Sequence, residues 1–400
     1  FRKIEPLFCV GLIFQTAQAA MTFGKRGTTD MVRFSCEKAL VQQAVAAVSR
    51  AVAAKSSIPA LEGILLECGE GLRLSGYNMQ TGIRTTVEAA VSEAGHIVLN
   101  ARLFGEMIRR LPDDMVTFEA DDKFNVKLNC GDASFELPGL SADDYPELPE
   151  VDDQFSVTLE QRTLKAMINQ TSFAVSVNEA RPIHTGALFE ISDKGLTMVA
   201  VDGFRLALRR EPLEHIDGGA FKFVAPGAAL NEVEKICADT DDMVTVTQGK
   251  RHLMFEAGAT QLICRRLEGE FLDYKNAIPT TNPICIEVDN KTMIESLDRV
   301  SVVISEKLKS PVRCLFSQDR VYMSARTGNG EARDICPVRG DGQELEIGFN
   351  NRYLMDALRY APADTVKMQL NTGISPCIIT PVDDSDNFLY MVLPVRLKAQ

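Results

Sequence analysis

One helical stretch of this chain recurs three times, which indicates how the fold is built. Its last copy is Asn350-Asn351-Arg352-Tyr353-Leu354-Met355-Asp356-Ala357-Leu358, and similar stretches begin at Asn100 and Pro226. The interval from Asn100 to Pro226 is 126 residues, and the interval from Pro226 to Asn350 is 124 residues. Each stretch follows a short apolar strand and precedes an acidic turn and a strand with alternating apolar residues. Self-similarity at a nearly constant period indicates a repeat architecture.

A second repeated feature lies earlier in each unit. Residues 37–51, 160–174 and 291–304 carry apolar residues at helical spacing, and each leads into a hairpin. The sequence therefore predicts an α+β fold of three repeated domains, each with two helices backed by an antiparallel sheet. The expected domains are 31–150, 151–281 and 282–400, with 1–30 as an extension outside the fold.

The composition of the chain argues against several classes of protein. The chain has 43 basic and 55 acidic residues, a net charge of -12, and 45% hydrophobic residues, which is typical of a globular protein. The acidic balance argues against tight binding of nucleic acid by bulk charge. No apolar run reaches the roughly 20 residues of a membrane helix. Ten dispersed cysteines, four histidines and no nucleotide or nucleophile motif favour a protein without a catalytic residue, metal or cofactor.

The first thirty residues leave an alternative open. Residues 7–14 are apolar, and Ala17-Gln18-Ala19 is similar to a signal-peptide cleavage site. We favour a start at Met31 and a cytoplasmic protein with free thiols. The alternative is a secreted or periplasmic repeat-domain binding protein without DNA function, which predicts disulfides among the cysteines.

Four motifs on this repeat point to a family. They are Tyr-Met-Val-Leu-Pro-Val-Arg-Leu at 390–397, Val-Ala-Val-Asp-Gly-Phe-Arg-Leu-Ala at 199–207, Glu-Ala-Arg-Pro at 179–182, and Gly-Phe-Asn at 348–350 followed by Tyr353. In this order, from Met31 to Leu397, the chain resembles the bacterial replicative sliding clamp, the beta subunit of DNA polymerase III.

The resemblance implies a head-to-tail homodimer that closes into a ring around double-stranded DNA, without sequence preference and without catalysis of its own. It implies peptide contacts with the replicative DNA polymerase, the clamp loader and repair polymerases, and no membrane contact. Lys55 and Arg181 match loops that contact DNA in the family. The dimer interface would join Phe135 and Leu137 of one chain to Val302 and Val303 of the other. Further candidates for inward-facing charges are Arg50, Arg102, Arg109, Arg110, Lys165, Arg299, Arg352 and Arg359.

The resemblance also implies a hydrophobic pocket for partner peptides between the middle and last domains. Its matching positions are His184, Val201, Gly203, Phe204, Arg205, Leu206, Leu272, Asn276, Ala277, Leu308, Asn350, Tyr353, Ile374, Pro376, Met391, Val392, Leu393, Pro394, Val395, Arg396 and Leu397. Arg205 or Arg396 would donate hydrogen bonds to peptide carbonyls. The chain departs from the family at four positions: Phe204 replaces a frequent His, Val201 a frequent Thr, His184 an aliphatic residue and Leu272 a common Pro.

Overall fold

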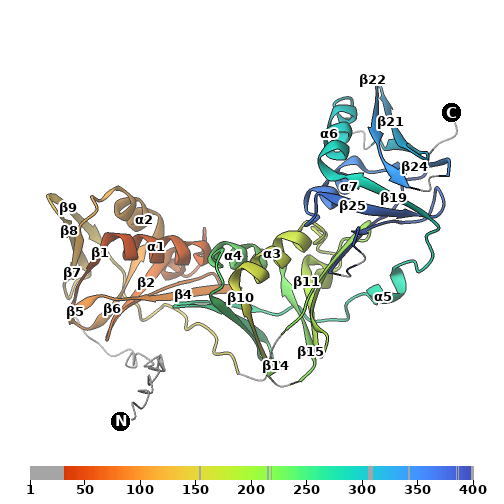
Figure 1. Ribbon diagram of the computed structural model, residues 1–400. Helices are drawn as coiled ribbons and strands as arrows, with labels where there is room; N and C mark the ends of the chain where they lie inside the picture. The colour runs from red at the N-terminus through yellow and green to blue at the C-terminus, as the bar shows by residue number, and fades with distance from the viewer. Residues whose placement is uncertain are drawn as a thin grey trace, which may run out of the picture.

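The computed structural model describes residues 31–152, 155–213, 216–217, 219–304, 310–340, 343–383, 385 and 387–397. The signal-like residues 7–19 and the pocket candidate Leu308 therefore lie outside the described residues. The chain forms a curved row of three α+β domains, with the helices on the concave side and the sheets on the convex side (Figure 1). No helix in the described part of the chain is long and apolar enough to span a membrane.

The first domain has two long helices among nine strands. Its elements are β1 (Val32–Glu37), α1 (Lys38–Val48), β2 (Gly63–Cys68), β3 (Leu72–Tyr77), β4 (Thr81–Val87), β5 (Ala90–Glu93), β6 (Gly95–Asn100), α2 (Ala101–Arg110), β7 (Met115–Ala120), β8 (Asn125–Cys130) and β9 (Ala133–Pro138). Two 3-10 turns, Ser49–Ala51 and Pro59–Glu62, connect α1 to β2.

The middle and last domains repeat this order. The middle domain has β10 (Phe155–Glu160), α3 (Gln161–Ser172), β11 (Gly186–Ser192), β12 (Gly195–Val201), β13 (Arg205–Glu211), β14 (Ile216–Asp217), β15 (Phe221–Pro226), α4 (Gly227–Ile236), β16 (Met243–Gln248), β17 (His252–Ala257) and β18 (Thr260–Arg265). The short helix α5 (Tyr274–Ala277) follows. The last domain has β19 (Ile284–Asp289), α6 (Asn290–Ser301), β20 (Val312–Phe316), β21 (Arg320–Thr327), β22 (Gly330–Pro337), β23 (Arg339–Gly340), β24 (Leu345–Phe349), α7 (Asn351–Arg359), β25 (Thr365–Leu370), β26 (Cys377–Pro381) and β27 (Phe388–Val392).

Local chemistry explains where the second helix of each domain begins. The side chain of Asn100 accepts a hydrogen bond from the backbone N–H of Leu103, and Asn350 accepts from Arg352 and Tyr353. Asparagine is a favoured N-cap because its oxygen satisfies N–H groups that have no partner inside the helix. The middle-domain helix α4 starts instead after Pro226, without a side-chain cap.

The strands of each domain are divided between two sheets, a division that the predicted antiparallel sheet behind two helices did not specify. The sheet orders are β5-β1-β7-β8-β9, β14-β10-β16-β17-β18-β4-β3-β2-β6, β15-β11-β12-β13-β27-β26-β25-β19-β23 and β22-β21-β20-β24. The two nine-stranded sheets therefore run across the domain junctions. The predicted boundaries at 150/151 and 281/282 stay predictions, because strands from both sides share one sheet.

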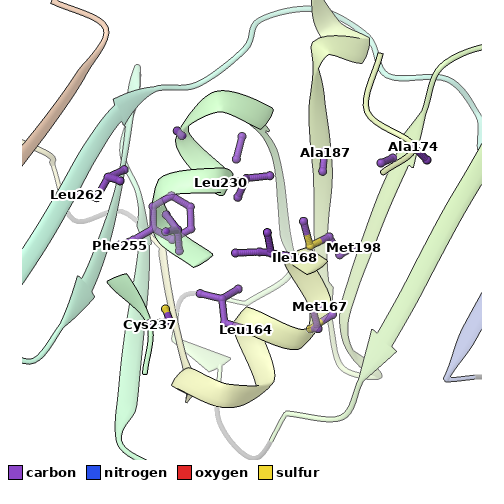
Figure 2. Close-up of a cluster of buried hydrophobic side chains, with 14 of the residues drawn as sticks. Leu164, Met167, Ile168, Ala174, Ala187, Met198, Leu230, Cys237, Phe255 and Leu262 are labelled. Atoms are coloured by element: carbon purple, nitrogen blue, oxygen red, sulfur yellow. The ribbon is translucent and has the colours of Figure 1, made fainter. Parts of the chain in front are cut away.

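The core of each domain lies between its helices and both sheets. In the middle domain, Leu164 and Ile168 of α3 meet Leu230 of α4, while Phe255 and Met198 approach from the two sheets (Figure 2). All five side chains expose 2% or less of their surface. Burial of this kind is the main stabilising contribution, and it fixes the helices on the sheets.

Candidate partner-peptide site and ring junctions

A rigid turn between β12 and β13 presents an aromatic side chain. Asp202 Oδ1 accepts hydrogen bonds from the backbone N–H of Phe204 at 2.9 Å and of Arg205 at 3.0 Å. Gly203 between them has a φ of 90°, in the left-handed region that favours glycine. Phe204 exposes 58% of its surface, although its backbone is held on both sides.

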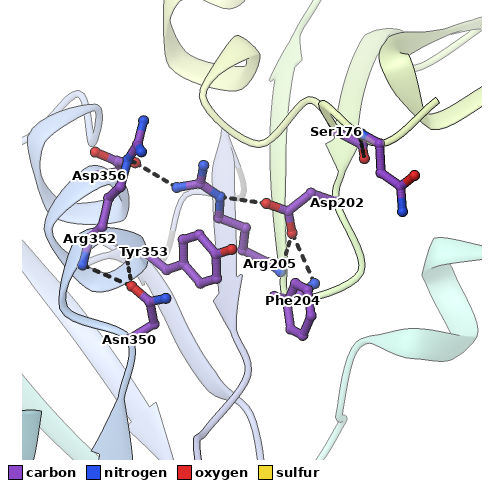
Figure 3. Close-up of polar contacts among 9 residues, drawn as sticks. Ser176, Asp202, Phe204, Arg205, Asn350, Arg352, Tyr353 and Asp356 are labelled. Atoms are coloured by element: carbon purple, nitrogen blue, oxygen red, sulfur yellow. Dashed lines mark hydrogen bonds and ion pairs between the residues drawn. The ribbon is translucent and has the colours of Figure 1, made fainter. Parts of the chain in front are cut away.

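Arg205 joins the middle domain to the last domain. Its Nε donates to Asp202 Oδ2 at 2.9 Å, and its Nη1 donates to Asp356 Oδ2 on α7 at 2.6 Å (Figure 3). The guanidinium carbon lies 4.5 Å from the ring centre of Tyr353 and 5.4 Å from that of Phe173. The side chain is 8% exposed, which such a cation tolerates because two carboxylates pair with it. Arg205 is therefore an interdomain contact, whereas Arg396, the other predicted peptide donor, is exposed.

The chain end completes the same junction. β13 pairs antiparallel with β27, and the N–H of Leu393 then donates to the carbonyl of Phe204 at 2.9 Å. Farther on, the N–H of Val395 donates to the carbonyl of Gly348 at 2.7 Å. A Cβ at Gly348 would lie 2.7 Å from the backbone oxygen of Val395, so a larger residue would displace the tail. The tail thus runs from the shared sheet to β24 of the last domain.

An apolar cluster lies on the outer face of the shared sheet. Its buried members are Leu188, Val199, Val201, Leu206, Leu208, Val224, Tyr274, Ile378 and Met391, with Ile183, Leu267, Phe271, Ile278, Leu389 and Leu393 packed at its edge. It contains the predicted pocket residues Val201, Leu206, Met391 and Leu393. His184 reaches its margin through an edge-to-face contact with Phe271 at 5.6 Å.

Helix α5 lies against this cluster and carries two more candidates, Asn276 and Ala277. The hydroxyl of Tyr274 donates to Glu190 Oε2 at 2.6 Å, and Lys275 Nζ lies 3.1 Å from the same oxygen. Burial together with the Glu190 carboxylate raises the pKa of Tyr274, so its hydroxyl keeps its proton. These contacts fix the four-residue helix to β11.

Among the edge strands of the sheets in the described part of the chain, two are the last strand of a three-strand meander. β9 ends the five-stranded sheet, and β22 ends the four-stranded sheet. Of the interface candidates, Leu137 is 5% exposed and Phe135 and Val303 pack partly against the core, whereas Val302 is 82% exposed. Thr327 Oγ1 donates to the carbonyl of Val303 at 2.7 Å, which joins the end of α6 to β21.

Comparison with known proteins identifies the family from all three domains. The chain matches the family models of the DNA polymerase III beta subunit over residues 32–149 for the N-terminal domain, 158–273 for the central domain and 275–396 for the C-terminal domain. It is 31% identical over 380 residues to the beta sliding clamp of Halalkalibacterium halodurans, which covers 91% of this chain and 100% of the relative. The chain belongs to the DNA polymerase III beta subunit family.

Other relatives agree with this assignment. The beta sliding clamp of Bacillus subtilis is 28% identical over 379 residues, covering 91% of this chain and all of the relative. The crystal structure of the Bacillus subtilis clamp matches with a TM-score of 0.87 at 27% identity, over 92% of this chain and 100% of that one. The beta subunit of Streptococcus pyogenes gives a TM-score of 0.87 at 27% identity, over 91% and 100%. The predicted clamp fold and the function as a non-catalytic processivity factor are confirmed.

The structure divides the predicted pocket of this clamp into two parts. Val201, Leu206 and Met391 belong to the apolar cluster, whereas Phe204, Arg205, Asn350 and Tyr353 form the aromatic and charged contact with α7. Leu272 is 45% exposed, and Ile374, which precedes Pro376 in the β25–β26 turn, is 75% exposed. The remaining tail positions are Val392, Leu393, Pro394, Val395, Arg396 and Leu397. The role of each residue in peptide binding stays a prediction.

Sequence reasoning missed the residues that position this site. Asp202 lies inside the quoted middle-domain motif, but its bonds to the turn were not predicted. Asp356 is six residues after Asn350, just as Glu106 and Glu232 are six residues after Asn100 and Pro226. Asp356 and Glu232 form interdomain ion pairs, whereas Glu106 pairs with Arg109 and Arg110 of its own helix.

The two DNA-contact candidates lie in accessible loops, and their contact with DNA stays a prediction. Lys55 and Arg181 are exposed and follow the first helix of their domains. Several other basic candidates take part in ion pairs, including Arg109 and Arg110 with Glu106, Lys165 with Asp239, and Arg299 with Asp334. In the described residues, no group of His, Cys, Asp and Glu is arranged to hold a metal ion.

Proposed function

We propose that this clamp works as a head-to-tail homodimer closed around duplex DNA, and that it tethers the replicative polymerase, the clamp loader and repair polymerases through short peptides. The observation that carries the proposal is a repeated junction. β18 pairs with β4 where the middle and first domains meet, and β13 pairs with β27 where the middle and last domains meet. In each case the last strand of one three-strand meander pairs with the last strand of another.

Two three-strand meanders take part in neither internal junction. They are β20–β22, which ends in β22, and β7–β9, which ends in β9. At both internal junctions the start of one strand lies opposite the end of the other, as with Thr81 opposite Cys264. The same register would bring Leu137 at the end of β9 to Gly330 at the start of β22. A Cβ at Gly330 would lie 3.7 Å from Val303 Cγ1, so Leu137 would approach the predicted Val302 and Val303. Two chains joined in this way close into six domains by twofold symmetry, which leaves neither edge unpaired.

The concave helical face is the side proposed to surround DNA (Figure 1). Lys55 and Arg181 would contact phosphates, which position a duplex without reading its sequence. A net charge of -12 disfavours tight binding, so contact with DNA should be weak and salt-sensitive. Retention would then come from the closed ring instead of from affinity.

The peptide site is proposed for the apolar cluster and the adjoining Phe204–Tyr353 contact, with the tail 391–397 as one wall. Support comes from the exposed aliphatic and aromatic groups at the rim, which suit a short apolar motif. A few buried aliphatic anchors give modest affinity once ordering costs are subtracted, which suits partners that exchange.

A reducing cytoplasm is the proposed compartment. All nine described cysteines are free, and eight of them are buried. Burial raises the pKa of Cys264 to about 12 and that of Cys237 to about 11. Since the thiolate is the form that reacts, these thiols resist oxidation and need no disulfide for the fold.

Retention on circular DNA tests the ring. The protein is loaded by a clamp loader onto nicked circular DNA, freed of unbound protein in moderate salt, and the circle is then cut. We expect the protein to stay on the circle and to leave after linearisation. Equal loss from circular and linear DNA would contradict encirclement.

Substitution of each of two exposed valines by glutamate tests the dimer junction. Val302→Glu puts a charge at the proposed junction, whereas Val177→Glu changes a 98% exposed valine on the middle domain. Light scattering should give a monomer mass for Val302→Glu and a dimer mass for Val177→Glu. A dimer in both variants would exclude Val302 from the interface.

A further inference from the structure

The hairpin turn between β3 and β4 has a counterpart between β12 and β13. Asn78 Oδ1 accepts hydrogen bonds from the backbone N–H of Gln80 at 3.0 Å and of Thr81 at 2.8 Å, the arrangement that Asp202 makes in the other turn. The next residue, Met79, has a positive φ of 69°, as the glycine of the other turn does. The first–middle and middle–last junctions are therefore built on the same backbone.

The strand ends that dock on these two turns can be matched with each other. The N–H of Arg265 donates to the carbonyl of Gln80 at 3.4 Å in the first turn. The N–H of Leu393 donates to the carbonyl of Phe204 at 2.9 Å in the second. Arg265 and Leu393 are therefore equivalent, as are the residues that follow them.

The neighbouring strands β17 and β26 give a second set of matches. Cys264 of β18 lies opposite Leu253, and Val392 of β27 lies opposite Cys377. Each of these pairs lies just before the docking residue, so Leu253 and Cys377 are equivalent. Counting back along both strands, the matched pairs are His252 with Pro376, Arg251 with Ser375, and Lys250 with Ile374.

The matched residues have opposite chemistry at the two junctions. At the middle–last junction, four of these positions carry apolar side chains of the predicted pocket, namely Ile374, Pro376, Leu393 and Pro394. At the first–middle junction, the same four positions carry basic side chains, namely Lys250, His252, Arg265 and Arg266. Arg251 adds a fifth basic side chain in place of a serine. Together these five residues form the basic edge.

The cations of the basic edge are poorly neutralised by the carboxylates of the chain. Within the described residues, no carboxylate forms an ion pair with Arg251, Arg265 or Arg266. The Nε atom of Arg266 is buried and has no hydrogen-bond partner there. Lys250 Nζ lies 4.0 Å from Asp152 Oδ2, but these side chains are 73% and 67% exposed, so the pair contributes little.

The local potential is positive in spite of two nearby carboxylates. Glu150 and Asp152 line a cavity of about 310 Å³ together with Lys250, Arg251 and His252. Burial, and then two arginines of the basic edge, lower the pKa of His252. A histidine pKa that arginines hold down indicates an excess of positive charge around the imidazole.

The basic edge points away from the helices. Side chains alternate between the two faces of a strand, and Leu253 and Cys264 point into the core beneath the helices, where they are 0% and 1% exposed. Their neighbours His252 and Arg265 lie opposite each other on β17 and β18 and therefore point to the convex side. A duplex enclosed by the concave helical face would not meet them (Figure 1). This orientation favours a ligand that runs over the outer surface.

The backbone that carries the basic edge is fixed before any ligand binds. The N–H of Gly249 donates to the carbonyl of His252 at 2.9 Å, which closes the β16–β17 turn. The N–H of Arg266 donates to the carbonyl of Arg251 at 3.0 Å, which joins this turn to the end of β18. Little backbone ordering is therefore needed on binding.

We propose that the basic edge binds an acidic segment of a partner protein, rich in Asp and Glu, on the outer surface of the first–middle junction. The inference goes beyond the proposed peptide site and does not depend on it. A guanidinium donates two parallel hydrogen bonds to one carboxylate, so three arginines on a fixed backbone suit an extended acidic peptide. Because the whole chain has a net charge of -12, an acidic peptide is repelled elsewhere and directed to this place.

The test measures the binding of a fluorescein-labelled peptide of six Gly-Glu repeats to the full-length protein, by fluorescence anisotropy at low ionic strength. A peptide of six Gly-Gln repeats is the uncharged control. We expect the acidic peptide to bind and to lose affinity as salt is added, because exposed charges are screened. The uncharged peptide should not bind.

Two double variants locate the bound peptide. Arg251→Gln with Arg265→Gln should raise the Kd by about 3- to 30-fold, the range expected for two exposed ion pairs. Arg251→Lys with Arg265→Lys keeps the charge and should raise it less. The matched control, Arg33→Gln with Arg320→Gln, removes two arginines that each pair with a carboxylate outside the basic edge. It should change the Kd by less than about 2-fold, because distant exposed charges are screened.

Two results would overturn the inference. The first is an acidic peptide that does not bind, or that loses affinity equally in the two Arg→Gln double variants. The second is a short DNA duplex that binds more tightly than the peptide and loses affinity in Arg251→Gln with Arg265→Gln, which would make the basic edge a phosphate contact. Retention on circular DNA should be the same in this variant and in the wild type, so failure of the inference is distinguishable from failure of the ring.

Discussion

At the junction of the middle and last domains, β13 pairs with β27 beside a buried arginine held by two carboxylates. At the junction of the first and middle domains, β4 pairs with β18, and the arginine of the cross-domain ion pair is more exposed than Arg205. There Arg50 Nη1 is 3.5 Å from Glu232 Oε2, and the Arg50 side chain is 38% exposed. The carboxylates Glu232 and Asp356 occupy equivalent positions, but their arginines come from different places.

The side chains packed around the β13–β27 and β4–β18 strand pairs also differ. Phe173 of the middle domain stacks on Tyr360 of the last domain at 5.1 Å and meets Tyr390 edge-on at 5.2 Å. The first junction has instead a contact between the hydroxyls of Thr85 and Thr260 at 2.9 Å. The strand ladder therefore supplies the connection at both places, and side chains decide which junction also positions a binding site.

The largest expected effect comes from removing the shared carboxylate of the buried pair. Asp356→Ala leaves Arg205 with Asp202 alone inside the junction. The free energy of unfolding should fall by about 2 to 3 kcal/mol, the cost of losing a charged hydrogen bond from a buried cation. Urea unfolding followed by circular dichroism measures it.

Glu232→Ala is the matched control, because it removes the equivalent carboxylate at the exposed junction. The free energy of unfolding should fall by less than about 1 kcal/mol in this variant, since partly exposed ion pairs contribute little. Equal losses for both variants would mean that burial does not distinguish the two junctions.

Substitutions of Gly203 and Met79, the residues with positive φ in their two hairpin turns, should change the free energy of unfolding in opposite directions. A Cβ at Gly203 meets no atom within 4 Å, so Gly203→Ala is penalised only by its positive φ and should cost about 1 kcal/mol. Met79→Gly relieves the same strain and should stabilise by up to about 1 kcal/mol. Two losses in the unfolding experiment would show that the turns are not equivalent.

The sequence predicted the repeat better than the connections between repeats. The repeat interval and the helical spacing of apolar residues located the helices, and hairpin patterns located the strands. The pairing of β4 with β18 was not predictable, because the outer strand of a meander does not encode its next neighbour. The division of each domain between two sheets was missed for the same reason.

The candidate site was predictable where it is local. The Asp202-Gly203-Phe204 turn belongs to one motif, and its geometry follows from an Asp side chain and a glycine. The partner of Arg205 was not predictable, because Asp356 lies 151 residues away and the arginine was interpreted as a peptide donor. Arg205 is an interdomain contact in this structure, and its role as a peptide donor stays a prediction.

The smallest expected effect is a pH dependence that compares one histidine near each junction. Burial and then Arg265 and Arg251 lower the pKa of His252, and burial and then Arg181 lower the pKa of His184. The folded state therefore binds fewer protons than the unfolded state below the ordinary histidine pKa of 6.5. The stability from both groups is present above pH 6.5 and is lost as the pH falls toward their folded pKa values.

Urea unfolding between pH 7.5 and 6.0 should show a fall in the free energy of unfolding, which His252→Gln and His184→Gln each reduce. A fall that neither substitution reduces would exclude both histidines as its cause. A larger effect of His184→Gln would make the peptide-site junction the more pH-sensitive one.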